Sequence, residues 1–320
     1  MRLVMMGTGT FAEPTFKALL AGRHQVVGLV TNPDRPSGRD RSMLRGMKQV
    51  ALEHNIPVFQ PESINTPEGV AGLQAFQPDL LVVAAYGQIL SRDVLAVPPL
   101  GGINVHASLL PKYRGAAPIA WAIYHGERQT GVTIIRMSVQ LDAGDMLAQE
   151  AIDIGPQETT GELEARLAQL GARLAVETVE KLAAGPVQGQ PQDKTQATKA
   201  PKLTKEHGAI DWTRPAAAVC NQIRAMQPWP TPYTYLHRAG QPPVRLIVLQ
   251  ASPAQADARG HAPGELVPTE DQPAFRVAAG GNTAVDIASV QPAGKRAMRA
   301  EEFLRGHRLQ PGDRLGPETP

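Results

Sequence analysis

Cysteine is almost absent from this sequence, which has a single thiol, Cys220, in 320 residues. One cysteine excludes a disulfide framework and a zinc site made of several thiolates. Long hydrophobic runs are also missing, and none approaches the roughly 18 apolar residues that cross a bilayer. No secretory leader precedes the apolar run that starts at Arg2, so we expect a cytoplasmic protein with no membrane partner.

An excess of charge of one sign is missing too, because 32 Lys and Arg stand against 30 Asp and Glu, a net charge of +2. That balance excludes a general polycation that binds nucleic acid over its whole surface. The charge is nevertheless uneven. Residues 1–190 hold 16 basic and 18 acidic side chains, whereas residues 191–320 hold 16 and 12. The second part of the chain therefore carries the basic excess.

Apolar runs and helical patterns alternate through the first part of the chain. This alternation predicts an α/β fold, with a doubly wound, mostly parallel sheet and helices on both faces. The expected strands are Arg2–Met6, Gln25–Val30, Ile56–Val58, Asp79–Ala85, Ile103–His106 and Thr130–Met137. The expected helices are Pro14–Ala21, Met47–His54, Glu68–Phe76, Pro118–His125 and Thr159–Leu182. Ligands of such sheets bind at the carboxyl ends of the strands.

The last third of the chain has a different pattern. Residues 186–205 hold few large apolar side chains, which predicts a linker. Short apolar segments separated by Pro and Gly then predict a small β-barrel. Its expected strands are Val244–Leu249, Gly264–Val267, Phe275–Ala278 and Thr283–Val290. We therefore expect a first domain at 1–188, a basic linker at 189–206 and a second domain at 207–320.

A glycine-rich turn follows the first strand. Residues 7–12 read GTGTFA, which matches the dinucleotide fingerprint and makes an NAD-dependent oxidoreductase one hypothesis. The fingerprint also needs an acidic residue at the end of the second strand. Here Asp34 comes only after a turn proline, so a glycine-rich turn that binds no nucleotide is the favoured interpretation.

Two polar side chains interrupt the expected strand at 103–106. Asn104 and His106 are two residues apart and therefore point to one face of the sheet. A central parallel strand is normally apolar, so this pair favours a functional site over a satisfied buried histidine. Asp142 lies in the loop at 138–145 and can approach His106 if the two strands are neighbours.

These three side chains suit attack on a carbonyl group. Asn104 and a protonated His106 can stabilise an oxyanion, His106 can transfer a proton, and Asp142 can orient the imidazole. No nucleophile is in place, because Ser108 lacks a nucleophile elbow and Cys220 lies in the other half of the chain. We therefore expect direct transfer without a covalent intermediate.

Three segments carry a resemblance to a known family: Asn104–His106 (NVH), Ser108–Gly115 (SLLPKYRG) and Leu141–Asp145 (LDAGD). In them the chain resembles the folate-dependent formyltransferases, which transfer a formyl group from 10-formyltetrahydrofolate to an amine. Over nearly its whole length it is similar to the branch that formylates initiator methionyl-tRNA. This wider similarity runs through residues 31–37, 56–61, 85–87, 202–203, 210–212, 228–230 and 291–298.

The resemblance implies roles for individual residues. Asn104, His106 and Asp142 match the family's catalytic trio. The residues expected to bind the 10-formyltetrahydrofolate cosubstrate are Ser108, Leu109, Leu110, Pro111, Gln88, Ile89, Leu90 and Leu141. No metal and no NAD are implied.

The resemblance also implies initiator methionyl-tRNA as partner, a C-terminal OB-like barrel and, in our expectation, a monomer. Residues 34–48 are expected to form a basic loop that enters the acceptor end of the tRNA, with Arg39 at the position of the family's key arginine. The other expected tRNA contacts are Arg41, Arg45, Lys202, Lys205, Lys295 and Arg296. An ordinary solvated surface is the alternative for each of them.

Three other hypotheses stay open at this point. A sugar-amine N-formyltransferase would share the NVH and SLLP segments. An NAD-dependent oxidoreductase rests on the GTGTFA turn. A non-catalytic tRNA-binding protein rests on the basic second part of the chain, and it would tolerate the loss of His106.

Overall fold

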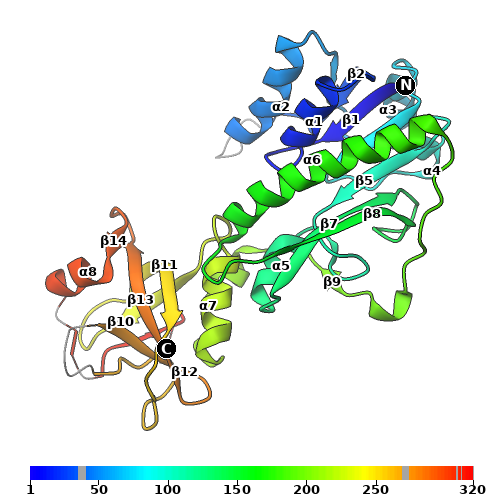
Figure 1. Cartoon of the computed structure of the whole chain (residues 1–320). Coiled ribbons are helices and arrows are strands. Elements are labelled where there is room, and N and C mark those ends of the chain that lie inside the picture. The colour runs from blue at the N-terminus through cyan, green and yellow to red at the C-terminus, as the bar shows by residue number, and fades with distance from the viewer. Residues whose placement is uncertain (35–40, 269–273, 308, 311, 320) are drawn as a thin grey trace. The chain divides into compact units, whose positions relative to one another are not determined.

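The computed structural model describes residues 1–34, 41–268, 274–307, 309–310 and 312–319. The chain forms two compact units. Unit 1 consists of Met1–Pro118, Gln129–Asp153 and Glu162–Pro201. Unit 2 consists of Ile119–Arg128, Ile154–Gly161 and Lys202–Pro320. Each unit has its own sheet and is described here by itself (Figure 1).

Unit 1 is built on a seven-stranded sheet in the order β3-β2-β1-β4-β5-β7-β8. Its strands are β1 Arg2–Gly7, β2 Gln25–Val30, β3 Val58–Phe59, β4 Leu80–Ala84, β5 Gly102–His106, β7 Gln129–Arg136 and β8 Met146–Asp153. The pairs from β3 to β5 are parallel, and β5–β7 and β7–β8 are antiparallel. The predicted doubly wound, mostly parallel fold is confirmed.

Helices cover both faces of this sheet because its strands are apolar on both sides. Val4 and Met6 of β1 pack in one cluster with Leu73 of α3 (Pro67–Gln74) and Val94 of α4 (Arg92–Leu95). On the opposite face lies the long helix α6 (Thr160–Ala184), drawn in green in Figure 1. A Cβ atom on Gly171 of α6 would lie 2.7 Å from Val105 of β5, so glycine permits this close approach. Helix α1 (Glu13–Leu20) begins shortly after the glycine-rich turn.

The prediction of a loop at 34–48 is wrong for residues 41–48. Helix α2 spans Arg41–Glu53 and begins well before the expected Met47. Gly46 does not break the helix. It faces α1 so closely that a Cβ atom would lie 2.5 Å from the Glu13 carboxylate. Met47, Val50 and Ala51 are buried at three- and four-residue spacing, which stabilises the helix through packing.

Strand β8 has no counterpart among the predicted strands. It is an edge strand, paired on one side with β7 in the seven-stranded sheet. The exposed residues Gln149, Ala151 and Asp153 alternate with half-buried ones in its second half, so it lacks the apolar run that marks the central strands. The weak signal follows from its place at the edge.

Residues 189–206, the expected linker, contain ordered structure. Gln190 forms an antiparallel bridge with Met146, and a short 3₁₀ helix spans Lys194–Gln196. Strand β9 (Lys199–Ala200) then pairs with β6 (Arg114–Gly115), and Ala200 is fully buried. The boundaries expected from composition stay a prediction. The residues up to Pro201 are nevertheless part of unit 1.

Unit 2 holds a six-stranded antiparallel sheet in the order β12-β13-β11-β10-β15, with β14 paired to β13. Its strands are β10 Tyr233–His237, β11 Val244–Pro253, β12 Phe275–Ala279, β13 Thr283–Pro292, β14 Met298–Arg299 and β15 Arg314–Gly316. Gly264–Val267, expected as a strand, instead makes isolated bridges from Glu265 to β15 and from Leu266 to β12. These bridges bring the two ends of the sheet together, so the predicted barrel is confirmed as nearly closed.

Unit 2 also contains the helices α5 (Pro118–Tyr124), α7 (Ala216–Ala225) and α8 (Ala300–Gly306), and a 3₁₀ helix that spans Lys205–Gly208. Side chains of α7 and α8 complete the core of the barrel. Phe303 of α8 stacks on Phe275 of β12 with ring centroids 5.5 Å apart. Cys220 of α7 is buried in this core, and burial raises the pKa of its thiol to about 12. None of the helices in the described ranges has the length and apolarity to cross a membrane.

Candidate active site

The strand β5 positions two of the expected catalytic side chains. Asn104 pairs with Val83 of β4 and Ile135 of β7, and His106 pairs with Thr133 of β7. β5 is the strand at which parallel pairing gives way to antiparallel pairing. Because paired residues share a face, Asn104 and His106 lie on the face opposite to Val105 and α6.

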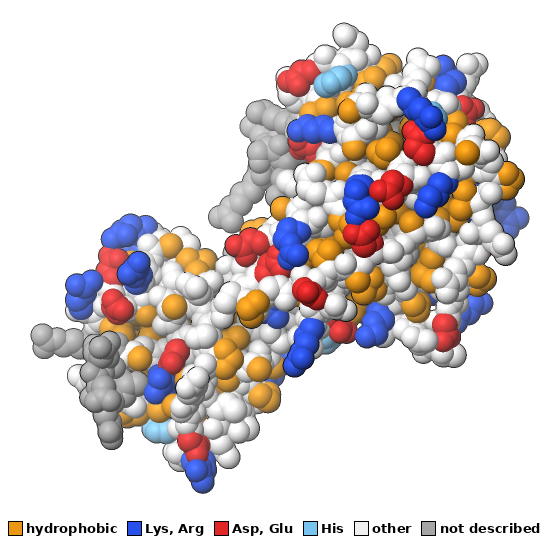
Figure 2. Space-filling view, viewed as in Figure 1, with side chains coloured by type: hydrophobic (Ala, Val, Ile, Leu, Met, Phe, Trp, Pro, Cys, Tyr) orange, Lys and Arg blue, Asp and Glu red, His pale blue; other side chains and the backbone are white. Residues whose placement is uncertain are grey.

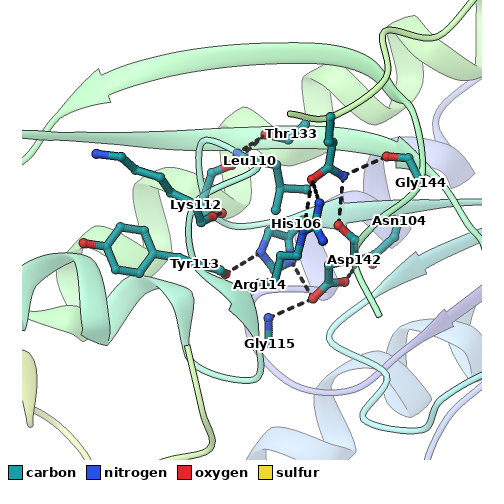
Figure 3. A network of polar contacts seen from close by, with 12 residues as sticks. Asn104, His106, Leu110, Lys112, Tyr113, Arg114, Gly115, Thr133, Asp142 and Gly144 are labelled. Atoms are coloured by element: carbon teal, nitrogen blue, oxygen red, sulfur yellow. Dashed lines mark hydrogen bonds and ion pairs between the residues drawn. The ribbon is translucent and has the colours of Figure 1, made fainter. Parts of the chain in front are cut away.

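Asp142 meets both of these side chains, because the loop after β7 starts beside β5 (Figure 3). Its Oδ1 accepts a hydrogen bond from Asn104 Nδ2 at 3.3 Å, and its Oδ2 lies 3.7 Å from His106 Nδ1. The backbone N–H of Gly115 donates to the same Oδ2 at 2.9 Å. The side chains of His106 and Asp142 are only 5% and 10% exposed, so their interaction is shielded from water.

The ring of His106 is held from two sides. Its Nε2 lies 2.9 Å from the carbonyl oxygen of Tyr113, which can only accept, so Nε2 carries a hydrogen. Nδ1 is then the nitrogen that faces Asp142 and can take up or release a proton. A doubly protonated ring would meet an acceptor at each nitrogen, an arrangement suited to a group that stabilises negative charge.

The segment from Ser108 to Pro111 is fixed by hydrogen bonds within unit 1. The buried Ser108 hydroxyl donates to Lys112 O at 2.7 Å. Thr133 Oγ1 donates to Ser108 O at 2.7 Å and accepts from Leu110 N at 3.1 Å. Gln149 Nε2 donates to Leu110 O at 2.9 Å and to Thr133 Oγ1 at 2.8 Å. The Leu110–Pro111 bond is cis, while Leu109 and Pro111 are half-buried.

Thr133 and Gln149 are site residues that the sequence reasoning missed. Thr133 is a fully buried polar residue in an apolar strand, the same signal that marks Asn104 and His106. Gln149 lies on the edge strand β8 and carries no comparable signal.

The other expected folate residues follow β4 or β7. Gln88 Oε1 accepts from Ile64 N at 2.9 Å, and Gln88 Nε2 donates to Asn32 Oδ1 at 3.3 Å. Leu90 is buried in the core, whereas Ile89 is 66% and Leu141 56% exposed. Exposed apolar side chains of this size offer surface that a flat aromatic ligand can cover.

Tyr86 lies two residues before Gln88 and is buried in the same core cluster as Leu90. Burial raises the pKa of its phenol to about 12. Within the described part of the chain, its hydroxyl has no hydrogen-bond partner.

The glycine-rich turn is connected to the end of β2 by side chains. Thr8 Oγ1 accepts from Asn32 Nδ2 at 3.1 Å, and Asn32 Nδ2 also donates to Tyr86 O at 2.8 Å. Asp34, the acid that a dinucleotide would require, accepts from Lys48 Nζ at 2.6 Å. The acid is thus engaged by a lysine of α2. In the described residues, no group of three or more His, Cys, Asp or Glu side chains could hold a metal ion.

The expected tRNA contacts fall into two sets. Arg39 lies outside the described residues, and Arg41 and Arg45 belong to helix α2 rather than to a loop. The second set is exposed on unit 2 and consists of Lys202, Lys205, Lys295 and Arg296. Arg296 forms an ion pair with Glu302. The face of the molecule in Figure 2 mixes basic and acidic side chains, so positive charge there is local rather than continuous.

Comparison with known proteins assigns both parts of the chain. Residues 1–179 match the family model "Formyl transferase", and residues 202–308 match "Formyl transferase, C-terminal domain". A methionyl-tRNA formyltransferase of Citrifermentans bemidjiense is 44% identical over 99% of this chain and 96% of its own. One of Bacillus subtilis is 42% identical over 98% of each chain.

Solved structures show the same fold at lower identity. A sugar 3-N-formyltransferase crystallised with dTDP and 5-N-formyl-THF has a TM-score of 0.66 and 17% identity. The match covers 92% of this chain and 99% of that one. HypX from Aquifex aeolicus in complex with tetrahydrofolic acid has a TM-score of 0.58 and 17% identity, covering 95% of this chain and 46% of its own.

Proposed function

Since this chain belongs to the formyl transferase family, we propose that it transfers a formyl group to the methionine amino group of initiator methionyl-tRNA. The proposed donor is 10-formyltetrahydrofolate. The observation that carries the chemistry is the shielded contact of Asn104 and His106 with one carboxylate, that of Asp142. The full-length similarity to methionyl-tRNA formyltransferases supports the choice of acceptor.

In the proposed mechanism the neutral amine attacks the formyl carbon directly. Asn104 Nδ2 and a protonated His106 stabilise the oxyanion of the tetrahedral intermediate. The new bond joins the methionine nitrogen to the formyl carbon, and the bond from that carbon to the folate nitrogen breaks. One proton leaves the amine and one reaches the folate nitrogen, and His106 Nδ1, oriented by Asp142, handles this transfer.

The proposed donor site lies along the ends of β4 and β5. Ser108–Pro111 supplies a rigid segment, because Thr133 and Gln149 already satisfy its internal hydrogen bonds. Ile89 and Leu141 supply the exposed apolar surface for the ring system of the folate. Gln88 holds the loop at Ile89 in place through Ile64.

The proposed tRNA contacts are electrostatic. Lys202, Lys205 and Lys295 are exposed, and no ion pair of theirs is present in the described part of unit 2. With aromatics at 4% of the chain, extensive base stacking is not available. Arg39→Ala should raise KM for methionyl-tRNA and lower the salt dependence of binding by about one unit of slope, while KM for the donor stays constant. Arg23→Ala, a change at an exposed arginine of unit 1, is the control.

The deciding experiment measures radiolabelled formyl transfer from 10-formyltetrahydrofolate. Wild-type protein should formylate methionyl-tRNA and leave an amino-sugar nucleotide unmodified. His106→Asn should reduce kcat by at least about 100-fold, whereas His54→Asn, at an exposed histidine, should leave it unchanged. Transfer to the sugar alone would replace this function with that of a sugar formyltransferase. Normal kcat in His106→Asn would refute the mechanism.

Two further properties belong to this proposal. We expect the protein to act as a monomer in the cytoplasm, with the domain boundaries at 188 and 207. Light scattering of the purified protein, alone and with methionyl-tRNA, measures the oligomeric state. A dimer at the protein concentrations used in the transfer assay would contradict the expected monomer.

A further inference from the structure

The loop that carries Asp142 is held by Gln192, a side chain that no sequence motif marks. Gln192 is 9% exposed and follows β8 by about forty residues. Its Nε2 donates to Asp142 O at 2.9 Å and to Gly144 O at 2.7 Å. These bonds hold the backbone of the loop, whereas Asn104 and Gly115 bond the Asp142 carboxylate.

Arg114 sets the orientation of the Gln192 amide. Arg114 Nε and Nη2 donate to Gln192 Oε1 at 3.1 and 2.7 Å. The carboxamide thus uses both of its donors and both lone pairs of its oxygen. Rotating the amide by 180° would face its NH₂ to the guanidinium and its oxygen to two carbonyls. All four hydrogen bonds would be lost, so only one orientation fits.

The loop needs such a restraint because Asp142 has a left-handed backbone, with φ at +48°. Residues other than glycine adopt this conformation at a cost and keep it where the surroundings impose it. The two bonds from Gln192 fall on Asp142 and Gly144, on either side of Ala143. They oppose a backbone rotation that would move the carboxylate away from His106.

Strand β6 contacts both the Asp142 carboxylate and Gln192. Gly115 N donates to Asp142 Oδ2 at 2.9 Å, and the preceding Arg114 orients Gln192 (Figure 3 shows Arg114, Gly115, Asp142 and Gly144). β6 is itself paired with β9, a few residues after Gln192. The carboxylate and the backbone of Asp142 are therefore both fixed relative to one short strand.

We propose that Gln192 is a positioning residue for formyl transfer, which acts by holding Asp142 in the geometry that orients His106. The inference rests on the proposed function. It makes Gln192 matter for the chemical step rather than for binding of either substrate. A displacement of about 1 Å at a catalytic group can cost about 100-fold in rate.

The test compares Gln192→Glu and Gln192→Ala with Gln196→Ala. The glutamate keeps the size and the contact with Arg114 but turns an acceptor toward the two carbonyls. Both variants at 192 should lose about 10- to 100-fold in kcat, with KM for 10-formyltetrahydrofolate and methionyl-tRNA within about twofold. Gln196 is exposed on the same segment and bonds Asp193, so its variant should match the wild type.

A double-mutant cycle separates positioning from general destabilisation. If Gln192 acts through Asp142, then Gln192→Glu should change kcat less than about twofold in an Asp142→Asn background. The inference is wrong if the reductions in kcat caused by the two substitutions multiply in the double variant. It is also wrong if Gln192→Glu alone has wild-type kcat. If Gln192→Ala does not fold, the glutamate variant decides. Absence of transfer by the wild-type protein would refute the proposed function, whereas unaffected variants beside an active wild type refute only the role of Gln192.

Discussion

Replacing Thr133 by valine tests how firmly the Ser108–Pro111 segment is held in unit 1. The side chain is fully buried, and valine has nearly the same shape. The hydroxyl donates to Ser108 O, accepts from Leu110 N and accepts from Gln149 Nε2. Gln149 keeps its bond to Leu110 O in the variant. Two backbone groups, Ser108 O and Leu110 N, are therefore left without this partner.

An unsatisfied buried polar group costs about 1–3 kcal/mol, so the two groups together should destabilise unit 1 by about 2–6 kcal/mol in Thr133→Val. For a unit of this size each kcal/mol lowers Tm by about 2–4 °C. If about 1.4 kcal/mol of the loss falls on the donor site, KM for 10-formyltetrahydrofolate rises about tenfold.

Calorimetry and steady-state kinetics measure the two effects. Thr178→Val is the matched control, because Thr178 is equally buried but its hydroxyl makes a single bond, to Leu174 O within α6. We expect that variant to lose less than about 1 kcal/mol, with an unchanged donor KM. Equal destabilisation by the two variants would refute the reasoning, and so would an unchanged donor KM in Thr133→Val.

Three further predictions concern single positions. Gly115→Ala should lower the free energy of unfolding by about 2–4 kcal/mol and reduce kcat, because Gly115 has φ at +127° and a Cβ atom would lie 2.4 Å from Ala200 O. The control is Gly9→Ala, where φ is +84° but the space is open, and thermal unfolding should show a smaller loss of stability. Burial raises the pKa of Tyr86 to about 12, so the unfolded chain releases this proton first and stability falls between about pH 10 and 12. Tyr86→Phe should weaken that fall in urea titrations, and an identical alkaline limb would contradict the assignment. Burial also raises the pKa of Cys220 to about 12, so an aromatic disulfide reagent at pH 8 should label it only on unfolding; rapid labelling of folded protein would count against this.

Local patterns predict the central strands well, because those strands are buried on both faces. Gln25–Val30 has the same bounds in the sequence prediction and in the structure. The edge strand β8 escapes prediction, since its exposed residues alternate with half-buried ones and leave no continuous apolar run. The prediction starts helix α2 at Met47 instead of Arg41, and the close approach of Gly46 to Glu13 in its first turns is a contact that no local pattern shows.

The residues of the site also divide into those that local patterns predict and those that depend on the tertiary structure. Asn104 and His106 are predictable because a polar pair on an apolar strand has period two. Asp142 is predictable only on the condition that β7 lies beside β5, and the strand order that meets this condition belongs to the tertiary structure. Gln192 has no signal at all, since an isolated glutamine in a polar segment resembles any surface residue.

The sequence by itself determined the alternation of strands and helices, the barrel pattern of the second part and the polar pair on β5. These features depend on side-chain period and composition, which act over a few residues. Only the tertiary structure decided which segments meet at Asp142. Its partners come from β5, β6 and the segment before β9, between 27 and 50 residues away along the chain. Such contacts depend on how sheet edges pair, and the free energy that favours them is shared by the whole unit.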